Sequence, residues 1–260
     1  MSDLNLVQAK VNYNAVWILA KRELWSFWRN KSRVISSIAQ AVLFLFVFGF
    51  IDIGNIMING ISISPQKFIA SGVPAMVILF TGIFGGMSIF RDKMFGFMKE
   101  LLVAPVSRRT LMLGRTAGVG LQTLIQVIIM IILGAILQYF GIVDIIFIFR
   151  VILIIPIAFL ASLGVVGMGL TISTRLNDMQ SFGLIQTFIV MPMMFLSGAV
   201  FPLPPFIIAF DPFSYCVDLF RFVLLGVSYF SPLLDFAVMV IFGAIFILLG
   251  AWSFNKMDAT

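Results

Sequence analysis

The sequence predicts an all-α integral membrane protein with six transmembrane helices, and three observations support this fold class. Hydrophobic residues make up 61% of the 260-residue chain, charged residues only 11%, and the mean hydropathy is +1.13. Soluble domains contain about 45–50% apolar and about 25% charged residues, so this chain lacks the charges that cover a soluble body. The apolar residues also occur in runs of about 20, the length of a helix that crosses a bilayer core of about 30 Å.

Six such runs follow one another along the chain, and each is predicted to span the membrane. They cover residues 34–53, 69–90, 117–140, 145–170, 182–201 and 233–252. Helices in globular proteins average about 11–12 residues, so buried soluble helices do not explain runs of this length. We therefore expect a transmembrane domain over residues 34–252, a cytoplasmic amphipathic helix over 1–33 and a cytoplasmic tail over 253–260. The polar first ten residues do not resemble a cleavable signal peptide.

The distribution of the 17 Lys and Arg residues predicts the orientation. With a cytoplasmic N-terminus, the inner segments hold 14 of them: Lys10, Lys21, Arg22, Arg29, Lys31, Arg33, Arg91, Lys93, Lys99, Arg108, Arg109, Arg115, Arg175 and Lys256. The outer side keeps only Lys67, Arg150 and Arg221. Positive charges favour the cytoplasmic side, so both termini are predicted to be inside, in the cytoplasmic membrane. The net charge of +6 then indicates contact with anionic lipids, and nucleic-acid binding is not favoured.

Several kinds of chemistry are absent from the sequence. It contains no His and a single cysteine, Cys216, so His-dependent catalysis, His-ligated zinc and a disulfide framework are excluded. It contains no G-x-x-x-x-G-K-[ST] phosphate-binding loop, so ATP hydrolysis would need a separate chain. Almost nothing ionisable is expected within the spans: Asp52 and Arg150 lie near outer ends, and Asp144 lies in an outer loop. We therefore expect no catalytic residues and no metal site, although Ser–Lys chemistry is not strictly excluded.

Residues 12–31 are predicted to form a basic amphipathic helix that lies in the membrane interface. Trp17, Ala20, Leu24 and Trp28 recur at helical spacing, while the basic residues point elsewhere. Tryptophan anchors beside basic side chains are typical of interfacial helices. A simple juxtamembrane anchor explains the same pattern, so the composition alone leaves both interpretations open.

The longest inner loop, residues 91–115, contains a short predicted helix over residues 97–103, which Pro105 stops. Ser107 follows at a position where it can cap a second helix over residues 108–114. Such a short helix on the cytoplasmic face suits docking of a soluble partner. An ordinary turn between two spans is the alternative.

The outer segment 202–231 is too apolar for a solvated loop. Residues 206–210 and 217–226 are predicted to form two short helices, separated by Asp211-Pro212. Neither is long enough to cross the bilayer, so the segment is predicted to be a re-entrant or interfacial hairpin. Asp218 and Arg221 are spaced i, i+3 and are expected to form an ion pair.

Two features within the spans have more than one interpretation. Glycines at 82 and 86, and at 164, 167 and 169, allow close helix approach either inside one subunit or at a dimer face. The fifth run contains Pro192, which is expected to kink it. Its Met and Phe side chains suit either contact with lipid or the lining of a path for apolar cargo.

Three stretches resemble the membrane subunit of ABC transporters of the ABC-2 type, closest to the daunorubicin-resistance and nodulation-protein-like permeases. Residues 21–30 (KRELWSFWRN) are similar to the family's helix before the first span. Residues 100–108 (ELLVAPVSR) closely match its cytoplasmic motif, with Gly-Arg at 114–115 where Gly-Lys is usual. Residues 211–221 (DPFSYCVDLFR) resemble its outer motif, although Asn is commoner than Asp at 211. The motifs occur in the family's order over nearly the whole chain.

This resemblance implies a six-helix subunit that forms a homodimer with a second permease copy and binds two cytoplasmic ATPase subunits. ATP and Mg²⁺ would be bound by those partners, with no cofactor in this chain. Coupling to the ATPase is implied for Lys99, Glu100, Leu101, Leu102, Pro105, Ser107 and Arg108. The interfacial helix would contribute Arg22, Glu23, Trp25, Trp28 and Arg29. The translocation path would include Gln40, Phe44, Gln186, Met193, Met194 and Phe195. The outer gate would include Asp211, Pro212, Tyr215, Asp218 and Arg221.

The expected function is export of a hydrophobic or amphipathic compound, such as a drug or a lipid-like molecule. Export of a polysaccharide or glycolipid is the main alternative within the family. All four Trp residues lie near the cytoplasmic interface rather than along a path, which weighs against a stacking pathway for sugars. A passive channel or ion-coupled carrier is the alternative outside the family, but no filter or charged ladder is visible in the spans.

Overall fold

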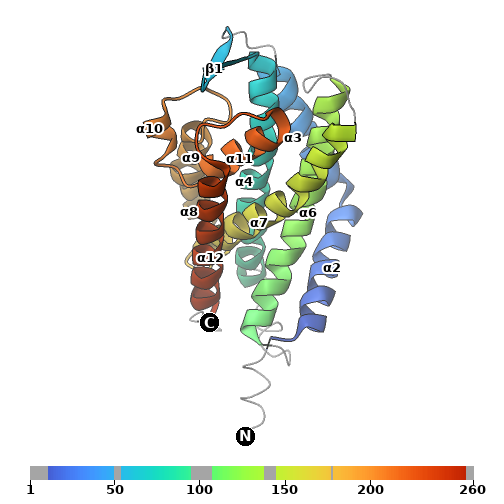
Figure 1. The fold of residues 1–260 in the computed structure, drawn as a ribbon. Helices are drawn as coiled ribbons and strands as arrows, with labels where there is room; N and C mark the ends of the chain where they lie inside the picture. The colour runs from blue at the N-terminus through green and yellow to red at the C-terminus, as the bar shows by residue number, and fades with distance from the viewer. Residues whose placement is uncertain (1–10, 50–53, 95–106, 138–144, 177, 256–260) are drawn as a thin grey trace, which may run out of the picture.

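The computed structural model describes residues 11–49, 54–94, 107–137, 145–176 and 178–255. These residues form an elongated, mostly helical bundle with one small sheet (Figure 1). The end of the bundle that carries this sheet is called the hairpin end. At the opposite end, called the base, α2 begins and α12 ends (Figure 1).

Four of the six predicted spans are confirmed as helices long and apolar enough to cross a membrane. They are α4 (Pro65–Met94), α6 (Arg108–Ile136), α7 (Ile145–Ser173) and α12 (Pro232–Asn255). α4 and α12 extend beyond their predicted runs at both ends, α7 extends beyond the end of its run, and α6 begins before its run but ends at Ile136. In α6 the predicted short helix over residues 108–114 is not separate, because the helix that Ser107 caps continues without a break into the third span.

The N-terminal amphipathic segment and the first predicted run form α2 (Tyr13–Arg29) and α3 (Lys31–Gly49), with a break at Asn30. The Oδ1 atom of Asn12 caps α2 by accepting hydrogen bonds from the amides of residues 14 and 15, at 3.1 and 3.3 Å. Figure 1 shows α2 running beside α6 near the base, with α3 continuing toward the hairpin end. The amphipathic helix α2 therefore packs against another helix of the same chain, α6.

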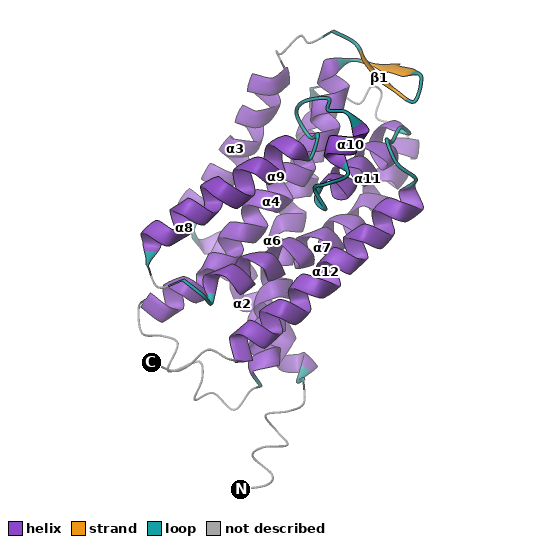
Figure 2. Ribbon diagram, turned by 90° about the vertical axis from the view of Figure 1, so that its left-hand side faces the viewer, coloured by secondary structure: helices purple, strands orange, loops and turns teal. Residues whose placement is uncertain are grey.

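The fifth predicted run is not one uniform α-helix. It comprises α8 (Met179–Ile185), a π-helical turn η1 (Gln186–Val190) and α9 (Met191–Leu196), which together form one rod in Figure 2. The π turn directly precedes Pro192, the residue predicted to kink the run. Proline lacks an amide hydrogen, and the changed hydrogen-bond pattern of a π turn is one way to accommodate this loss.

A small antiparallel hairpin, which the sequence analysis did not predict, covers the end of α4. Strands β1 (Ile56–Ile58) and β2 (Ile61–Ile63) are joined by Asn59-Gly60, both with positive φ. Asn-Gly between alternating apolar residues is a strong signal for such a two-residue turn. The Nδ2 atom of Asn59 donates to the carbonyl oxygen of Ser228 at 2.7 Å, which fastens the hairpin to the loop before α12.

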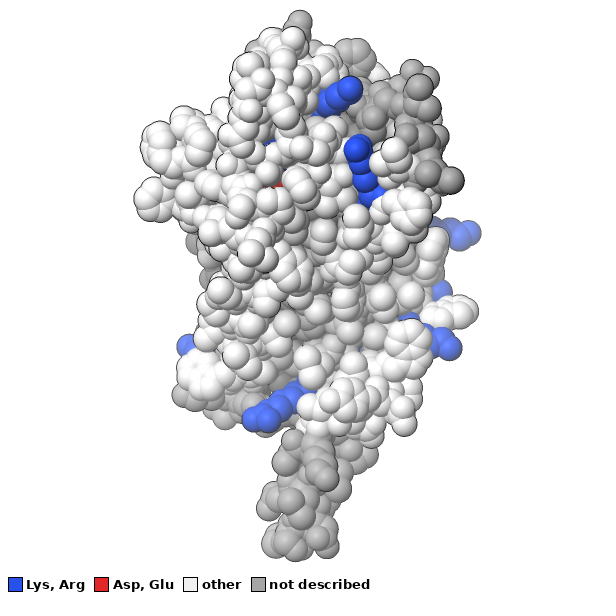
Figure 3. Space-filling model, in the orientation of Figure 1, with Lys and Arg blue, Asp and Glu red and all other residues white. Residues whose placement is uncertain are grey.

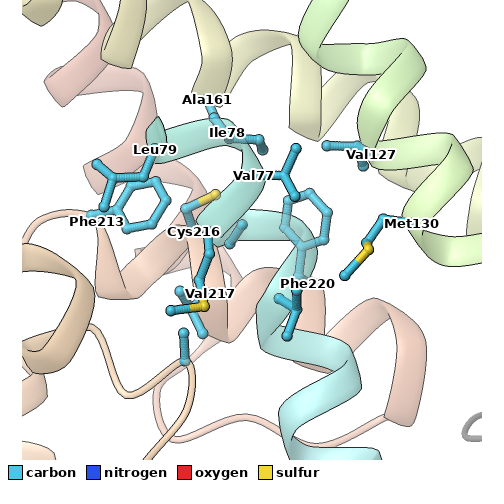
Figure 4. Packing of buried hydrophobic residues seen from close by; sticks show 14 of the residues in the cluster. Val77, Ile78, Leu79, Val127, Met130, Ala161, Phe213, Cys216, Val217 and Phe220 are labelled. Atoms are coloured by element: carbon cyan, nitrogen blue, oxygen red, sulfur yellow. The ribbon is translucent and has the colours of Figure 1, made fainter. Parts of the chain in front are cut away.

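The outer segment forms the two short helices expected from the sequence, α10 (Pro205–Ile208) and α11 (Ser214–Leu225). α11 packs against α4, α7 and α12 near the hairpin end. Figure 4 shows Phe220 of α11 directed toward Val77 of α4, with Val127 and Met130 of α6 beside them. α4 is the central helix of the bundle, because α3, α6, α7 and α11 all pack against it.

The glycines singled out from the sequence allow helices of this one chain to approach closely. A Cβ atom added at Gly82 would lie 2.6 Å from Cγ1 of Val165, and one at Gly86 would overlap the backbone of Gly169. Gly164 meets Gly243 of α12 in the same way. Packing inside the subunit, the first of the two interpretations, is therefore confirmed for these residues.

Substituting Gly86 by Ala is expected to destabilise the protein by about 1–3 kcal/mol, because α4 and α7 must separate to admit the methyl group. The control is Gly183→Ala, since nothing lies within 4 Å of a Cβ added there. The measurement is the midpoint of thermal unfolding in detergent. A Gly86→Ala midpoint as high as that of the control would contradict the role of this contact.

Candidate functional site

Buried charged side chains lie at the hairpin end, around the short helix α11. Asp211, Asp218, Arg221 and Asp235 are each less than 5% exposed. The sequence analysis predicted the first three as part of the outer segment but missed Asp235, which lies in the first turn of α12. The signal was available, since an Asp interrupts the apolar residues Leu233-Leu234 and Phe236 at the start of the last run.

Asp218 fastens α11 to the loop that leads into α12. Its carboxylate accepts hydrogen bonds from the amide of Tyr229, at 2.9 and 2.8 Å to its two oxygens, and from the amide of Phe230 at 2.9 Å. Backbone amides satisfy a buried carboxylate without a second side chain, and charge-assisted bonds of this kind are strong. Asp218 therefore fixes the chain direction between the two helices.

Arg221 connects three parts of the chain. Its Nη2 atom donates to the carbonyl oxygen of Gly198, after α9, at 3.0 Å. Its guanidinium carbon lies 3.9 Å from the ring centre of Phe68 in α4 and 5.9 Å from that of Tyr229. Asp218 and Arg221, whose spacing allows them to pair, make no direct ion-pair contact within 4.0 Å in the described part of the chain. Burial raises the pKa of Asp218, and the charge of Arg221 acts to lower it. Each side chain instead binds backbone groups of other segments, because burial leaves those groups without water.

The turn between α10 and α11 contains the other predicted gate residues. The Oδ1 atom of Asp211 accepts from the amide of Phe213 at 3.0 Å, while its Oδ2 atom is buried without a hydrogen-bond partner among the described residues. Burial raises the pKa of Asp211 to about 7, and the Phe213 amide opposes this shift. Tyr215 donates to the carbonyl oxygen of Ala209 at 3.2 Å and stacks on Phe230. Pro212 is exposed.

At the base, the structure describes only two of the seven residues predicted for coupling. Lys99, Glu100, Leu101, Leu102 and Pro105 lie outside the described residues. The Oγ atom of Ser107 accepts from the amide of Thr110 at 3.2 Å, which confirms the predicted helix cap, and Arg108 is the first residue of α6. The motif found in the sequence therefore leads directly into a membrane-length helix.

α2 is held against the first turns of α6. Cβ atoms added at Gly114 and Gly118 would each lie 2.6 Å from a side-chain Cβ of α2, those of Leu19 and Glu23. The amide of Asn12 also donates to Oγ1 of Thr110 at 3.1 Å. Gly114 and Gly118 thus allow α2 to pack closely against α6.

The predicted interfacial residues lie mostly on the opposite face of α2. Trp17, Trp25 and Trp28 are more than half exposed, whereas Ala20, predicted on the same face as Trp17 and Trp28, is buried against Gly118 of α6. Arg22 and Glu23 form an ion pair at 3.8 Å. Arg22, Trp25 and Arg29 line a cleft of about 850 Å³ at the junction with α3.

The residues predicted for the translocation path lie on α3, η1 and α9. Phe44 of α3 stacks on Phe80 of α4, with ring centres 6.0 Å apart, and Phe195 stacks on Phe201 at 6.3 Å. Met194 is buried and Met193 is partly buried. Gln40 lies in α3 and Gln186 in η1, and their side chains are outside the described part of the structure. A role in transport stays a prediction for these residues.

These features define a class: an integral membrane protein with long apolar helices, whose buried polar side chains bind backbone groups at the hairpin end and whose amphipathic helix α2 packs on α6. A protein-family comparison then makes the assignment specific, because the model of the ABC-2 type transporter family matches residues 14–225. The chain belongs to the ABC-2 type transporter family. Members of this family are the membrane subunits of transporters and are not themselves the ATPase.

Curated relatives agree with this family. The chain is 27% identical to a putative transport permease, ycf38, of Porphyra purpurea over 218 residues, which cover 79% of this chain and 72% of that protein. It is 26% identical to nodulation protein J of Rhizobium leguminosarum bv. viciae over 242 residues, with 89% of each chain covered. A ycf38 permease of Pyropia yezoensis is 28% identical, with 81% of this chain and 74% of that protein covered.

Replacing Arg221 by Met is expected to loosen α11, because the carbonyl of Gly198 loses its buried donor at a cost of about 2 kcal/mol. Cys216, the only cysteine of the chain, is buried on the same helix and reports this change. Its labelling by a small maleimide is expected to become about thirtyfold faster. Arg22→Met, which removes an exposed arginine at the base, is the control. Equal labelling of Arg221→Met and wild type would show that the contact does not hold the helix.

The stability of the protein is expected to fall as pH rises from about 4 to 7. In this window Asp211 keeps a proton in the folded state that it has lost in the unfolded chain, because its folded pKa is raised to about 7. Asp211→Asn keeps an acceptor for Phe213 but cannot ionise, so its thermal midpoint should depend less on pH. The control is Asp178→Asn, since hydrogen bonds from Ser181 lower the pKa of that exposed carboxyl. An unchanged pH dependence in Asp211→Asn would contradict the prediction.

Proposed function

We propose that this chain is the membrane-spanning subunit of an ATP-driven exporter in the cytoplasmic membrane. The observation that carries the proposal is the ELLVAPVSR motif directly before α6, in a chain that belongs to the ABC-2 type transporter family. The sequence contains no phosphate-binding loop of the G-x-x-x-x-G-K-[ST] type, so ATP and Mg²⁺ would be bound by partner ATPase subunits. Two such ATPases and a second copy of this chain, forming a homodimer, complete the proposed transporter.

The proposed topology has six spans and two cytoplasmic termini. α3 and the α8–η1–α9 rod would supply the first and fifth spans beside the four membrane-length helices. The base, where α2 begins and α12 ends, would then face the cytoplasm (Figure 1). The hairpin end, with α10 and α11, would face the outer side.

Coupling is proposed to act through α6. Movement of an ATPase would displace residues 99–105, and Ser107, which follows this segment closely in the chain, caps α6. Because α2 lies on Gly114 and Gly118 and is tied to Thr110, it would move together with α6. ATP binding would thus shift the population of the subunit between inward-open and outward-open states.

The outer segment is proposed to act as a gate. Arg221 ties α11 to the segment after α9, and Asp218 ties it to the loop before α12. A displacement of α9 or α12 would therefore be transmitted to α11. The buried position of these two side chains makes the closed arrangement specific, because opening would expose them or leave them unpaired.

A hydrophobic or amphipathic compound, drug-like or lipid-like, is the proposed cargo. The residues that support it are the apolar side chains of α3 and α9, including Phe44, Met193 and Phe195. Export of a polysaccharide or glycolipid is the alternative. It would be favoured if such a glycan, rather than an amphipathic drug, stimulated ATP hydrolysis by the reconstituted complex.

The coupling proposal predicts that Glu100→Arg and Pro105→Ala reduce co-purification with the partner ATPase, or uncouple its ATP hydrolysis from transport, by tenfold or more, on the order of 1.4 kcal/mol. The readouts are ATPase recovery on an affinity-tagged permease and ATP hydrolysis in proteoliposomes. Met57→Ala, in an exposed position of β1 at the other end of the molecule, is the control. Unchanged complex formation and unchanged transport in both variants would refute the proposed coupling role.

A further inference from the structure

A polar cavity of about 410 Å³ opens at the hairpin end, between the β-hairpin, α4, α7 and the end of α11. Its lining residues come from these separate elements: Asn55, Ile61, Ser62, Ile63, Ser64, Lys67, Arg150, Leu224, Leu225 and Val227. The cavity lies apart from the fastenings of Asp218 and Arg221, and the proposed transport function does not use it.

Two cations, one from α4 and one from α7, line this cavity. Lys67 belongs to α4 and Arg150 to α7, and no Asp or Glu occurs among the described residues that line the cavity. Among the described residues, neither cation forms an ion pair. Figure 3 shows basic side chains at the hairpin end, above a large uncharged area in the middle of this face, with further basic side chains along the right-hand edge and near the base. Such a pair of cations attracts an anion.

The position of these cations is unusual for the chain. Of the 17 Lys and Arg residues, only Lys67, Arg150 and Arg221 were assigned to the outer side, and Arg221 is buried in the fold. The two remaining outer cations therefore meet in one cavity, although positive charge is disfavoured on that side. Arg150 has one structural hydrogen bond, in which its Nη1 atom donates to the carbonyl oxygen of Leu224 at 2.8 Å. This bond uses one of the guanidinium N–H groups and leaves the others for a ligand.

Enough donors remain for an oxyanion. A guanidinium carries five N–H groups, of which the Leu224 bond uses one, and the ammonium of Lys67 carries three. The hydroxyl groups of Ser62 and Ser64 lie on the same wall. Arginine and lysine are the side chains that bind phosphate most often, with geometric matching from arginine and point charge from lysine.

The two cations lie near the ends of membrane-length helices, where lipid headgroups are expected. Lys67 is in the first turn of the membrane-length segment 65–86, and Arg150 is near the start of the segment 146–173. Charged side chains at the ends of spans reach the interface. Leu224, Leu225 and Val227 supply an apolar wall beside the cations. We propose that this cavity binds the phosphate headgroup of a lipid-like amphiphile, which in the proposed orientation lies in the outer leaflet.

The proposal is tested by ligand-dependent thermal unfolding of the purified full-length permease in detergent. Phosphatidylglycerol is the probe, diacylglycerol with the same acyl chains is the control without phosphate, and glycerol 3-phosphate is the soluble phosphate. Phosphatidylglycerol is expected to raise the unfolding midpoint, and diacylglycerol is not. A rise with glycerol 3-phosphate as well would support a site for free phosphate, whereas a rise with the lipid alone would support a lipid-borne headgroup.

Substitutions at Lys67 test whether phosphatidylglycerol binds in this cavity. Lys67→Gln is expected to weaken the apparent affinity for phosphatidylglycerol about tenfold, because it removes one charge-assisted contact, and Lys67→Arg is expected to restore it. Arg109→Gln, which removes an exposed cation at the start of α6, should bind as wild type does. Lack of any midpoint rise in wild type, or equal affinity in Lys67→Gln and wild type, would overturn the proposal. ATP and the ATPase take no part in this measurement, so its outcome is distinct from that of the coupling experiment.

Discussion

The absence of water in a bilayer core is the constraint on which this structure depends, since backbone polar groups at that depth must be satisfied within the protein. Helices satisfy them internally, and α4, α6, α7 and α12 do so over membrane-spanning lengths. Among the described residues, irregular backbone is concentrated at the hairpin end. There, amides and carbonyls outside the helices bind buried side chains instead, namely Asp218 for two amides and Arg221 for the carbonyl of Gly198.

With no strong hydrophobic force between helices in lipid, close backbone contact becomes the main means of holding the bundle together. Glycines provide it where α4 crosses α7, and where α2 lies on α6. The two contacts have different consequences. The contact between α4 and α7 lies at the centre of the bundle. The contact between α2 and α6 joins the amphipathic helix to the helix that follows the proposed coupling motif. Packing and proposed mechanical coupling thus rest on the same kind of contact.

Much of the architecture was predictable from local sequence. Runs of apolar residues indicated the long helices, and Ser107 indicated where α6 begins, because a serine before a helical run satisfies its free amides. The limits of that approach are visible at particular residues. The spacing of Asp218 and Arg221 predicted a pair, yet both bind backbone from segments distant in sequence. Asp235 was missed, and the Asn59-Gly60 hairpin was overlooked between two conspicuous apolar runs.

The sequence by itself determined that this is a membrane protein of mostly long helices, since composition and run length act locally and need no knowledge of neighbours. The motifs in the chain also indicated the ABC-2 type transporter family, to which it belongs. Only the tertiary structure decided which faces of the helices meet, which buried charges bind backbone, and that Lys67 and Arg150 share a cavity. These are contacts between residues far apart in the chain, and side-chain spacing within one helix carries no information about them.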